Sequence, residues 1–383
     1  MVLDIISVKT PAQLQAFINL PYELYRNDPV WRPPLRFERK AYMDVSKNPS
    51  LASLDYQLYV AKRDNKIVGR IAAFINKAHQ NHHHDDAGHF GFLDCVSDKD
   101  IGQALIRTAE EWLKKRGAKK VVGPAQWSVN DECGMLVEGF QHPPVIMMSF
   151  GRADYPQILE MSGYQKTIDM FAFQADLKAG FPRPKMATRM FEYAKNHKSI
   201  TSRPINMGQY EKDMALSMEV FNDAWSENWG FLPFTDSQVK HLADEMKPII
   251  LKDCFHIGYI DGEAAAFACM IPDLNEATKD LDGKLFPLGW AKLLYRLKAH
   301  KIKQCRMPLM GLRKKWHNTR KGLALVSLLC ETGFANAKNK YGFTHCELSW
   351  ILEGNKGMIS IAEQASAVHY KTYRMYELSL IHI

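Results

Sequence analysis

Hydrophobic and polar positions in the first half of the chain predict a helix, a hairpin and a strand–helix–strand unit, in that order. The first helix is expected at residues 10 to 27, because apolar residues recur there at helical spacing behind Thr10 and Pro11. Alternating β-branched and aromatic runs and one amphipathic run give the other elements, which are a hairpin at 57–75, a strand at 88–96, a helix from Lys99 to Gly117 and a strand at 120–123.

The second half of the chain repeats this order. Its predicted elements are a strand at 200–205, a helix at 207–225, a hairpin at 255–270, a strand at 306–312, a helix after Gly322, a strand at 344–352 and a further helical stretch that ends in 370–376. Because two halves with one order of elements indicate two copies of one fold, we expect an N-terminal domain at 1–178, a linker at 179–199 and a C-terminal domain at 200–383, both of the α+β (α/β) class.

One segment of the second half has the sequence of an anion-binding turn. The apolar run 306–312 passes through a basic turn into a helix that starts near Gly322. A glycine allows a ligand to approach the backbone, and free N–H groups in the first turn of a helix attract anions. Arg320 and Lys321 add positive charge. The sequence therefore predicts a pyrophosphate site at this turn.

The residues Thr319-Arg-Lys-Gly-Leu-Ala324 resemble the acyl-CoA loop of the GNAT N-acyltransferase superfamily, usually written Gln/Arg-x-x-Gly-x-Gly/Ala. Thr319 departs from that pattern at its first position. The strand at 344–352, Asn355 and a following helix that bears Tyr370 are similar to the end of a GNAT domain. Lys99-Asp-Ile-Gly-Gln-Ala104 repeats the Gly-x-Ala core in the first half.

This resemblance implies two tandem GNAT-like domains, each a mixed, mostly antiparallel twisted sheet flanked by helices. It also implies that an acyl-CoA or acetyl-CoA co-substrate binds there. The implied cofactor-binding residues are Thr319, Arg320, Lys321, Gly322, Leu323, Ala324 and Asn355 in the second half, and Lys99, Gly102 and Ala104 in the first. The first-half loop is either a second carrier site or a degenerate copy.

Longer phrases resemble a narrower group, the YghO-like or bacterial ceramide synthase-like (BcerS-like) family. These phrases include Asp28-Pro-Val-Trp-Arg-Pro-Pro-Leu35, Gly69-Arg-Ile-Ala-Ala73, Glu138-Gly-Phe140 and Trp350-Ile-Leu-Glu-Gly-Asn355. The resemblance covers nearly the whole chain. For some members it implies N-acylation of a long-chain sphingoid amine by an acyl thioester.

Two residues are candidates for the chemistry of acyl transfer. In GNAT domains the cofactor lies where two neighbouring strands separate, and strand N–H groups polarise the thioester carbonyl. Tyr370 is placed like the general acid that protonates the leaving thiolate, and a core tyrosine is the alternative. Glu347 shares a strand face with His345 and Ser349, so it could act as a base through a water molecule or simply be solvated. Asp94 is the corresponding candidate in the first half.

Composition narrows the class of protein. The chain has 383 residues, a formal net charge of +8 and seven cysteines without a C-x-x-C pair. The modest positive charge suits an anionic ligand or an acidic membrane surface rather than nucleic acid, and the cysteines argue against a disulfide framework or a zinc site. The histidine-rich run 76–86 could ligate a metal, but a solvated turn is expected there, so no metal is predicted.

The location of the protein follows from its hydropathy. No uncharged run approaches the length of a membrane span, so we expect a cytoplasmic protein, or one peripheral to the inner membrane. Residues 286–298 form a basic amphipathic helix that either contacts an anionic membrane, lines an acyl-chain groove or packs on the second domain as an ordinary surface helix.

The leading hypothesis is an N-acyltransferase that moves an acyl group from acyl-CoA or acyl carrier protein to an amine, such as a sphingoid or other lipid precursor. One alternative is an aminoacyl transferase of the tandem-GNAT cell-wall type, although no heptad run marks the coiled coil frequent in that group. Another is a non-catalytic GNAT-fold module that binds a lipid or a protein.

Overall fold

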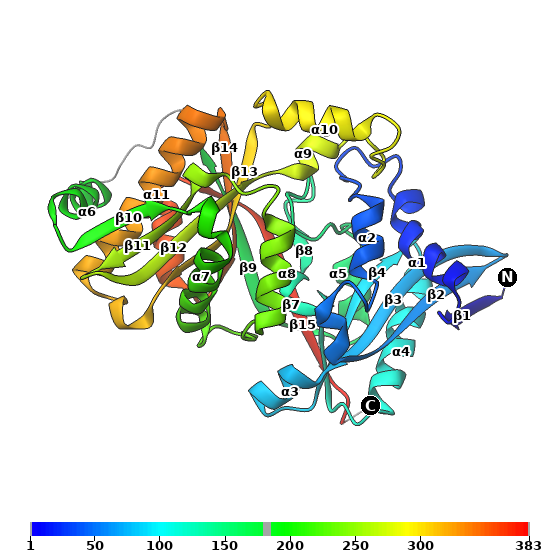
Figure 1. Ribbon diagram of the computed structural model, residues 1–383. Coiled ribbons are helices and arrows are strands. Elements are labelled where there is room, and N and C mark those ends of the chain that lie inside the picture. The colour runs from blue at the N-terminus through cyan, green and yellow to red at the C-terminus, as the bar shows by residue number, and fades with distance from the viewer. Residues whose placement is uncertain (1, 179–184, 382–383) are drawn as a thin grey trace. The chain divides into compact units, whose positions relative to one another are not determined.

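The computed structural model describes residues 2–178 and 185–381, which form two compact units (Figure 1). Unit 1 comprises Met1–Met170, Thr278–Leu285 and Lys371–Ile383, and unit 2 comprises Phe171–Ala277 and Phe286–Tyr370. Strands β9 (Gln165–Asp176) and β15 (Val368–Ser379) each pass from one unit to the other. The units therefore differ from the predicted ranges 1–178 and 200–383. Most of the last strand, β15, belongs to unit 1, and the second half of β9 belongs to unit 2.

Unit 1 is a sheet with helices on both faces. Its strands run in the order β1 (Leu3–Ser7), β2 (Leu54–Arg63), β3 (Lys66–Asn76), β4 (Ala87–Cys95), β5 (Lys120–Gly123) and β15, with β8 (Met135–Glu138) also on β15. Within the described residues β4 and β5 pair in parallel, and the pairs β1–β2, β2–β3, β3–β4, β5–β15 and β8–β15 are antiparallel. The small β6 (Ala125–Gln126) and β7 (Ser128–Cys133) pair separately. The helices are α1 (Pro11–Leu24), α2 (Arg36–Tyr42), α3 (Lys77–His83), α4 (Lys99–Lys114) and α5 (Tyr155–Met161).

Local sequence signals set the boundaries of these elements. Thr10 forms a capping box with Gln13 at the start of α1, which confirms the predicted helix start. Asp64 and Asn65 adopt φ values of 49° and 65° between β2 and β3, as a tight hairpin turn requires. Gly117, with φ +85°, lies just beyond the end of α4.

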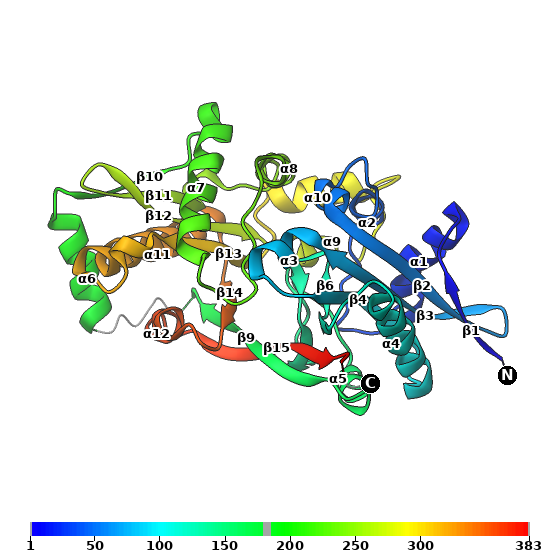
Figure 2. The same cartoon turned by 90° about the horizontal axis from the view of Figure 1, so that it is seen from below.

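Helices α1 and α4 cover opposite faces of the sheet of unit 1 (Figure 2). Neighbouring residues of a strand point to opposite faces. At Gly69 a β-carbon would meet Leu105 of α4, whereas Arg70 next to it donates to the carbonyl of Phe17 in α1 at 2.9 Å. The core of unit 1 therefore lies between the sheet and α4, where Leu105, Leu113 and other buried apolar side chains pack.

Unit 2 repeats the plan of unit 1. Its strands are β10 (Ile200–Pro204), β11 (Phe255–Ile260), β12 (Glu263–Pro272), β13 (Gln304–Leu312) and β14 (His345–Leu352). In the part of the chain that the structure describes, β13 and β14 pair in parallel, and β10–β11, β11–β12 and β12–β13 pair antiparallel. Its helices are α6 (Lys185–Asn196), α7 (Tyr210–Trp225), α8 (Asp236–Met246), α9 (Leu274–Thr278), α10 (Gly289–Lys298), α11 (Arg320–Tyr341) and α12 (Lys356–Gln364). Short 3-10 turns lie at Met207–Gln209, Lys252–Cys254 and Lys314–Trp316 in unit 2, and at Pro49–Ser53 in unit 1.

Two expectations for local structure are wrong. Tyr370 does not lie on the helix after Asn355, because α12 ends at Gln364 and residues 368–379 form β15. The segment contains three Tyr, one Thr and one Val, which favour a strand, and it pairs with β5 and β8. The histidine-rich run forms α3 rather than a solvated turn, with Asn76 capping its start and His84 in the left-handed conformation after its end.

Metal-binding and membrane-spanning features can be checked against the structure. Across residues 2–178 and 185–381, no group of three or more His, Cys, Asp or Glu side chains is arranged to hold a metal ion. None of the helices in this part of the chain has the length and hydropathy to cross a bilayer. All seven cysteines are thiols without a disulfide bond.

Candidate active site

Strands β13 and β14 of unit 2 separate at the point where the candidate residues lie. Their parallel pairing runs from Gln304 opposite His345 to Met307 opposite Leu348, the last pair recorded in the described part of the chain. A β-bulge places Met307 and Pro308 of β13 opposite Met270 alone, where the register with β12 shifts. Because a bulge bends its strand, β13 turns away from β14 beyond this point. Two neighbouring strands thus diverge as the GNAT resemblance implies.

A polar network crosses this divergence point. Arg306 and Glu347 are register partners on β13 and β14. The guanidinium of Arg306 donates to Oγ of Ser349 at 3.0 Å and to its carbonyl oxygen at 3.1 Å. The hydroxyl of Ser349 donates to Oε1 of Glu347, and the hydroxyl of Tyr370 donates to Oε2. Both carboxylate oxygens of Glu347 therefore accept a side-chain hydrogen bond.

Burial decides which member of this network a substrate can reach. The side chain of Glu347 is 0% exposed, and Arg306 and Ser349 are buried as well. Tyr370, at the start of β15, is half-buried. A buried carboxylate needs hydrogen bonds or a counter-charge, and the network supplies both. The structure thus brings the two predicted residues, Glu347 and Tyr370, into direct contact, and it leaves Tyr370 as the point of access.

The Gly322 turn differs from the predicted anion site. Thr319 is the N-cap of α11, and its Oγ1 accepts a hydrogen bond from the Gly322 amide at 3.0 Å. A β-carbon at Gly322 would lie 2.1 Å from the carbonyl oxygen of Trp316. The glycine is thus required by the loop itself. The expectation that the Gly322 amide is open to a diphosphate is wrong. Thr319, which stands where the family pattern has Gln or Arg, caps that amide with its side chain.

The basic side chains at this turn also have partners. Nζ of Lys321 lies 2.8 Å from Asp261, and the Arg320 guanidinium stacks 4.0 Å over the ring of Tyr193. Leu323 is exposed and Ala324 is buried. Asn355 caps α12 through a bond from the Met358 amide at 3.1 Å. Cofactor binding by these residues stays a prediction, and it would require Lys321 to exchange its ion pair.

The corresponding turn of unit 1 carries negative charge. Asp98 caps α4 and forms a 2.7 Å ion pair with Arg63, whose hydrogen bond lowers the pKa of Asp98. Asp100 follows in the first turn, between Lys99 and Gly102. A β-carbon at Gly102 would meet Ile158 at 2.7 Å, so this glycine allows α4 and α5 to pack. Two carboxylates at a helix start oppose a pyrophosphate. Carrier binding by Lys99, Gly102 and half-buried Ala104 stays a prediction that this charge disfavours.

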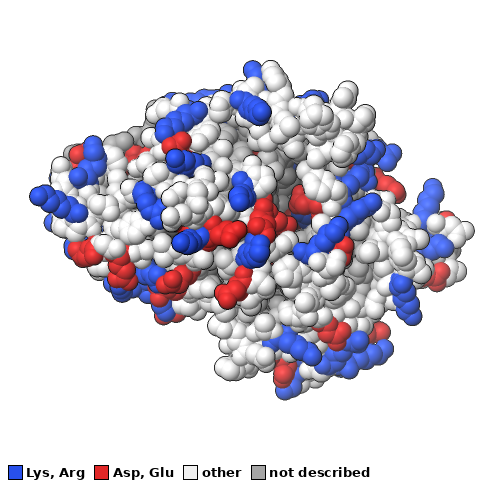
Figure 3. All heavy atoms as spheres, viewed as in Figure 1, with Lys and Arg blue, Asp and Glu red and all other residues white. Residues whose placement is uncertain are grey.

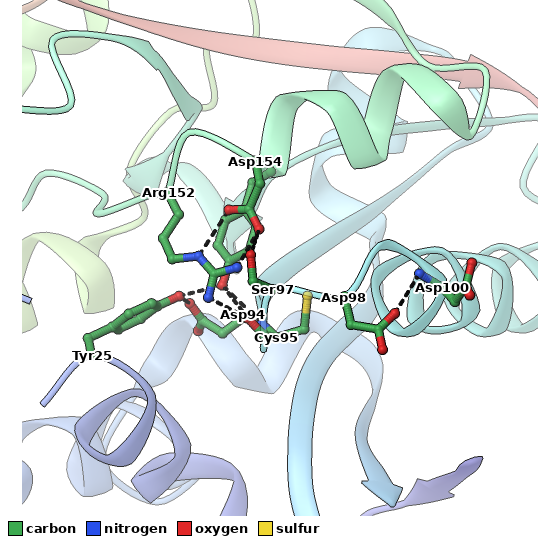
Figure 4. Close-up of polar contacts among 9 residues, drawn as sticks. Tyr25, Asp94, Cys95, Ser97, Asp98, Asp100, Arg152 and Asp154 are labelled. Atoms are coloured by element: carbon green, nitrogen blue, oxygen red, sulfur yellow. Dashed lines mark hydrogen bonds and ion pairs between the residues drawn. The ribbon is translucent and has the colours of Figure 1, made fainter. Parts of the chain in front are cut away.

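Unit 1 has its own polar network at the end of β4 (Figure 4). Tyr25 donates to Asp94, and its hydroxyl lies 2.6 Å from that of Tyr155. The Tyr155 hydroxyl accepts from the Cys95 amide at 3.0 Å, and Arg70 forms a 2.7 Å ion pair with Asp94. The strand amide of Cys95 is therefore already hydrogen-bonded within the protein.

The network of unit 1 is closed to solvent. Tyr25, Asp94, Cys95 and Tyr155 are all buried. Burial raises the pKa of both tyrosines well above the usual value, and it raises the pKa of the Cys95 thiol to about 12. Neutral phenols and a neutral thiol fit a structural role. Asp94, the candidate base of the first half, thus contacts a buried tyrosine, Tyr25, whereas Glu347 contacts the half-buried Tyr370.

Sequence reasoning missed Arg306 and gave no role to Ser349. Arg306 lies in a run that was interpreted as apolar. A charged residue inside an apolar strand needs a partner, and the neighbouring strand carries Glu347, so this pairing is the signal that points to Arg306. In unit 1, Arg70 and Tyr25 were missed in the same way.

Comparison with known proteins places the chain among acyltransferases. The profile of the family described as "Acetyltransferase (GNAT) family" matches residues 21–128. Protein YghO of Escherichia coli (strain K12) is 40% identical over 370 residues, which cover 95% of this chain and 92% of that protein. Bacterial ceramide synthase of Caulobacter vibrioides (strain NA1000 / CB15N) is 39% identical over 379 residues, covering 99% of this chain and 98% of that protein.

Solved structures give the fold. A tandem GNAT protein from the clavulanic acid biosynthesis pathway matches with a TM-score of 0.55 at 10% identity, covering 99% of this chain and 98% of that one. A GCN5-related N-acetyltransferase from Sphaerobacter thermophilus matches with a TM-score of 0.51 at 13% identity, covering 98% and 95%. The predicted tandem GNAT fold, with a mixed sheet flanked by helices, is confirmed.

Proposed function

Because the chain belongs to the YghO-like or bacterial ceramide synthase-like family within the GNAT acyltransferases, we propose that it transfers an acyl group from a thioester to the amine of a long-chain sphingoid base. The observation that carries this proposal is the 39% identity to Bacterial ceramide synthase along 99% of the chain. A ceramide is the amide of a sphingoid base and a fatty acid. The reaction therefore forms one C–N bond and breaks one C–S bond.

The contact between Tyr370 and Glu347 supports a proton path for this reaction. The neutral amine attacks the carbonyl carbon of the thioester, and the resulting N–H proton has to leave while the departing thiolate gains a proton. Tyr370 is half-buried, and in this proposal it is the group that meets both reacting atoms. Tyr370 accepts the amine proton while its own proton passes to Glu347, and it then protonates the thiolate and takes its proton back from Glu347.

Arg306 and Ser349 hold Glu347 in place for that exchange. The buried carboxylate alternates between a charged and a neutral form as the proton passes. The guanidinium of Arg306, linked to Glu347 through Ser349, offsets the negative charge in the first form. Removing it would leave a fully buried carboxylate without a cation nearby, which makes the charged form costly.

The acyl carrier is either coenzyme A or acyl carrier protein, which share a phosphopantetheine thioester. The capped Gly322 amide and the Lys321–Asp261 ion pair leave less of the turn available to a diphosphate than the family loop has. The same two contacts favour a second candidate function, a non-catalytic GNAT-fold module that binds a lipid. An acyltransferase turns the thioester and the amine into an amide, whereas the module only binds its lipid.

The test is an assay of the purified full-length chain with sphinganine and either palmitoyl-CoA or palmitoyl-acyl carrier protein. Mass spectrometry detects the N-acyl product, and a thiol reagent follows release of the carrier thiol. The proposal predicts a product with at least one carrier and its loss in Glu347→Gln. Absence of turnover with both carriers and with shorter acyl chains would overturn it, and sphinganine binding without turnover would support the module.

A further inference from the structure

Unit 2 exposes a group of large apolar side chains at α10 and the segment before it. Of the fifteen large hydrophobic residues that are exposed in the described part of the chain, five lie between residues 286 and 295. They are Phe286, Leu288, Trp290, Leu294 and Tyr295, and their exposure ranges from 46% for Leu294 to 82% for Phe286. Isolated exposed apolar residues are ordinary, but five within ten positions form a patch that needs a partner. We call these five residues the α10 patch.

The helix that carries the patch is firmly attached to unit 2 on its other side. Leu293 and Leu297 pack against the hydrophobic core of the unit. Arg296 donates to the carbonyl oxygen of Ala277, and the Trp290 indole N–H donates to the carbonyl oxygen of Pro287 at 3.0 Å. The exposure of the patch therefore does not come from a loose helix. It belongs to a helix whose inner face is already packed.

The chain from the patch onward is basic in sequence. Residues 286–303 include five basic residues and no aspartate or glutamate, and the basic ones are Lys292, Arg296, Lys298, Lys301 and Lys303. In Figure 3 the atoms over α10, at the top of the view, are white with blue ones beside them. Lysine side chains can extend past apolar neighbours and place their ammonium groups at a charged surface. The patch and its helix thus combine aromatic and aliphatic groups with basic ones.

We propose that the α10 patch docks the protein on an anionic phospholipid surface. Aromatic and leucine side chains enter the boundary between headgroups and acyl chains, and the lysines pair with the phosphates. An apolar groove of a protein partner would leave the basic residues of α10 without a counter-charge. An anionic bilayer offers phosphate groups along the whole helix. This inference goes beyond the proposed acyl transfer, and its test needs no turnover.

The experiment measures co-sedimentation of the full-length chain with phosphatidylcholine vesicles, with and without phosphatidylglycerol. Two variants address the two components, Trp290→Ser with Tyr295→Ser for the apolar part and Lys292→Glu with Lys298→Glu for the charge. Phe37→Ser, which changes an exposed aromatic residue on α2 of unit 1, is the matched control. All changed residues are exposed, and thermal unfolding checks that each variant is folded.

The expected result is binding to the anionic vesicles that weakens with added salt and is at least tenfold stronger than binding to neutral vesicles. Each double variant should lose tenfold or more of that affinity, while Phe37→Ser binds as the unchanged chain does. Failure of the unchanged chain to sediment with anionic vesicles would overturn the proposal. So would a Trp290→Ser, Tyr295→Ser variant with full binding, or a dimer in solution that this variant abolishes.

Discussion

The hydroxyl of Tyr370 donates a hydrogen bond to Oε2 of Glu347. This bond links the beginning of β15 to β14. Tyr370 is half-buried and Glu347 is fully buried. A proton exchanged at the tyrosine can therefore be shared with a carboxylate that solvent does not reach. This pair is the feature of unit 2 most directly suited to acid–base chemistry.

Tyr370→Phe and Glu347→Gln are each expected to lower kcat by about 100-fold or more, since positioned acid–base groups contribute about 10²–10⁴-fold. The double variant should be little slower than either single one, because the two residues act as one unit. The measurement is steady-state acyl transfer with saturating carrier. Tyr59→Phe, another half-buried tyrosine, is the control. Additive losses would contradict a shared proton.

Asp94→Asn tests whether unit 1 holds the chemistry instead. The substitution keeps the shape of the side chain, so the amide oxygen can still accept from Arg70 and the amide NH₂ can donate to the Tyr25 hydroxyl. If unit 2 is the site, kcat/KM should stay within a few-fold of its original value. A loss as large as that of Glu347→Gln, in a folded protein, would assign the reaction to unit 1.

Asp94→Ala should instead affect folding. The Arg70–Asp94 ion pair is nearly buried, and removing one partner of such a pair costs about 3–5 kcal/mol. Replacing both residues at once, as Arg70→Met with Asp94→Leu, should recover part of that loss, because no buried charge remains. Urea unfolding of the single and double variants measures the difference. This account would be contradicted if the double variant lost more free energy of unfolding than its two single variants lose together.

Gly322→Ala is expected to destabilise unit 2 by about 1–3 kcal/mol, the usual cost of forcing extra volume into a packed site. The added β-carbon would lie 2.1 Å from the carbonyl oxygen of Trp316, so the loop would have to shift. Gly354→Ala is the matched control, since nothing lies within 4 Å of its added β-carbon. Chemical denaturation compares the two. Equal stability of both variants would show that the loop yields easily.

His89 should make stability depend on pH. Burial lowers its pKa to about 3, whereas in the unfolded chain it titrates near about 6.5. A group whose pKa is lower in the folded state stabilises the fold above the unfolded pKa, and that contribution disappears as the pH falls toward the folded pKa. As the pH falls below 6.5 the free energy of unfolding should therefore fall, with a slope from this residue that approaches about 1.4 kcal/mol per pH unit near pH 5.

The matching variant is His89→Gln, which keeps a hydrogen-bond donor near the Val122 carbonyl but cannot be protonated. Its free energy of unfolding should fall less between pH 6.5 and 5 than that of the unchanged chain. His241→Gln, which makes the same replacement at a partly exposed histidine of α8, is the matched comparison. His79, whose pKa burial lowers to about 4, adds to the slope in all three proteins.

The sequence predicted most of the fold because the signals were local. Thr10 and Gln13 define the start of α1, and Asp64 and Asn65 define the first hairpin turn. The network in unit 2 was only half predicted. Glu347 and Ser349 share a strand face by alternation, but the partnership with Arg306 depends on the register between two strands, which no single stretch of sequence contains.

The closure of the Gly322 turn was also beyond local reasoning. A Gly-x-Ala segment at a helix start reads the same whether its amides face a ligand or its own loop. The deciding contacts come from Thr319 and the Trp316 carbonyl, whose positions follow from the path of the loop. Tyr370 was misplaced because its segment combines helix-compatible and strand-forming residues, and pairing with β5 and β8 settles it as a strand.

Strand β15 has a consequence for how the protein is made. Residues Thr372–Arg374 and Tyr376–Ser379 pair with β8 and β5 of unit 1, yet the ribosome adds them after all of unit 2. Nascent unit 1 therefore has the edge of β5 unpaired until unit 2 has been translated. An open strand edge invites association with other chains, so this delay is when a chaperone would be of most use to the protein.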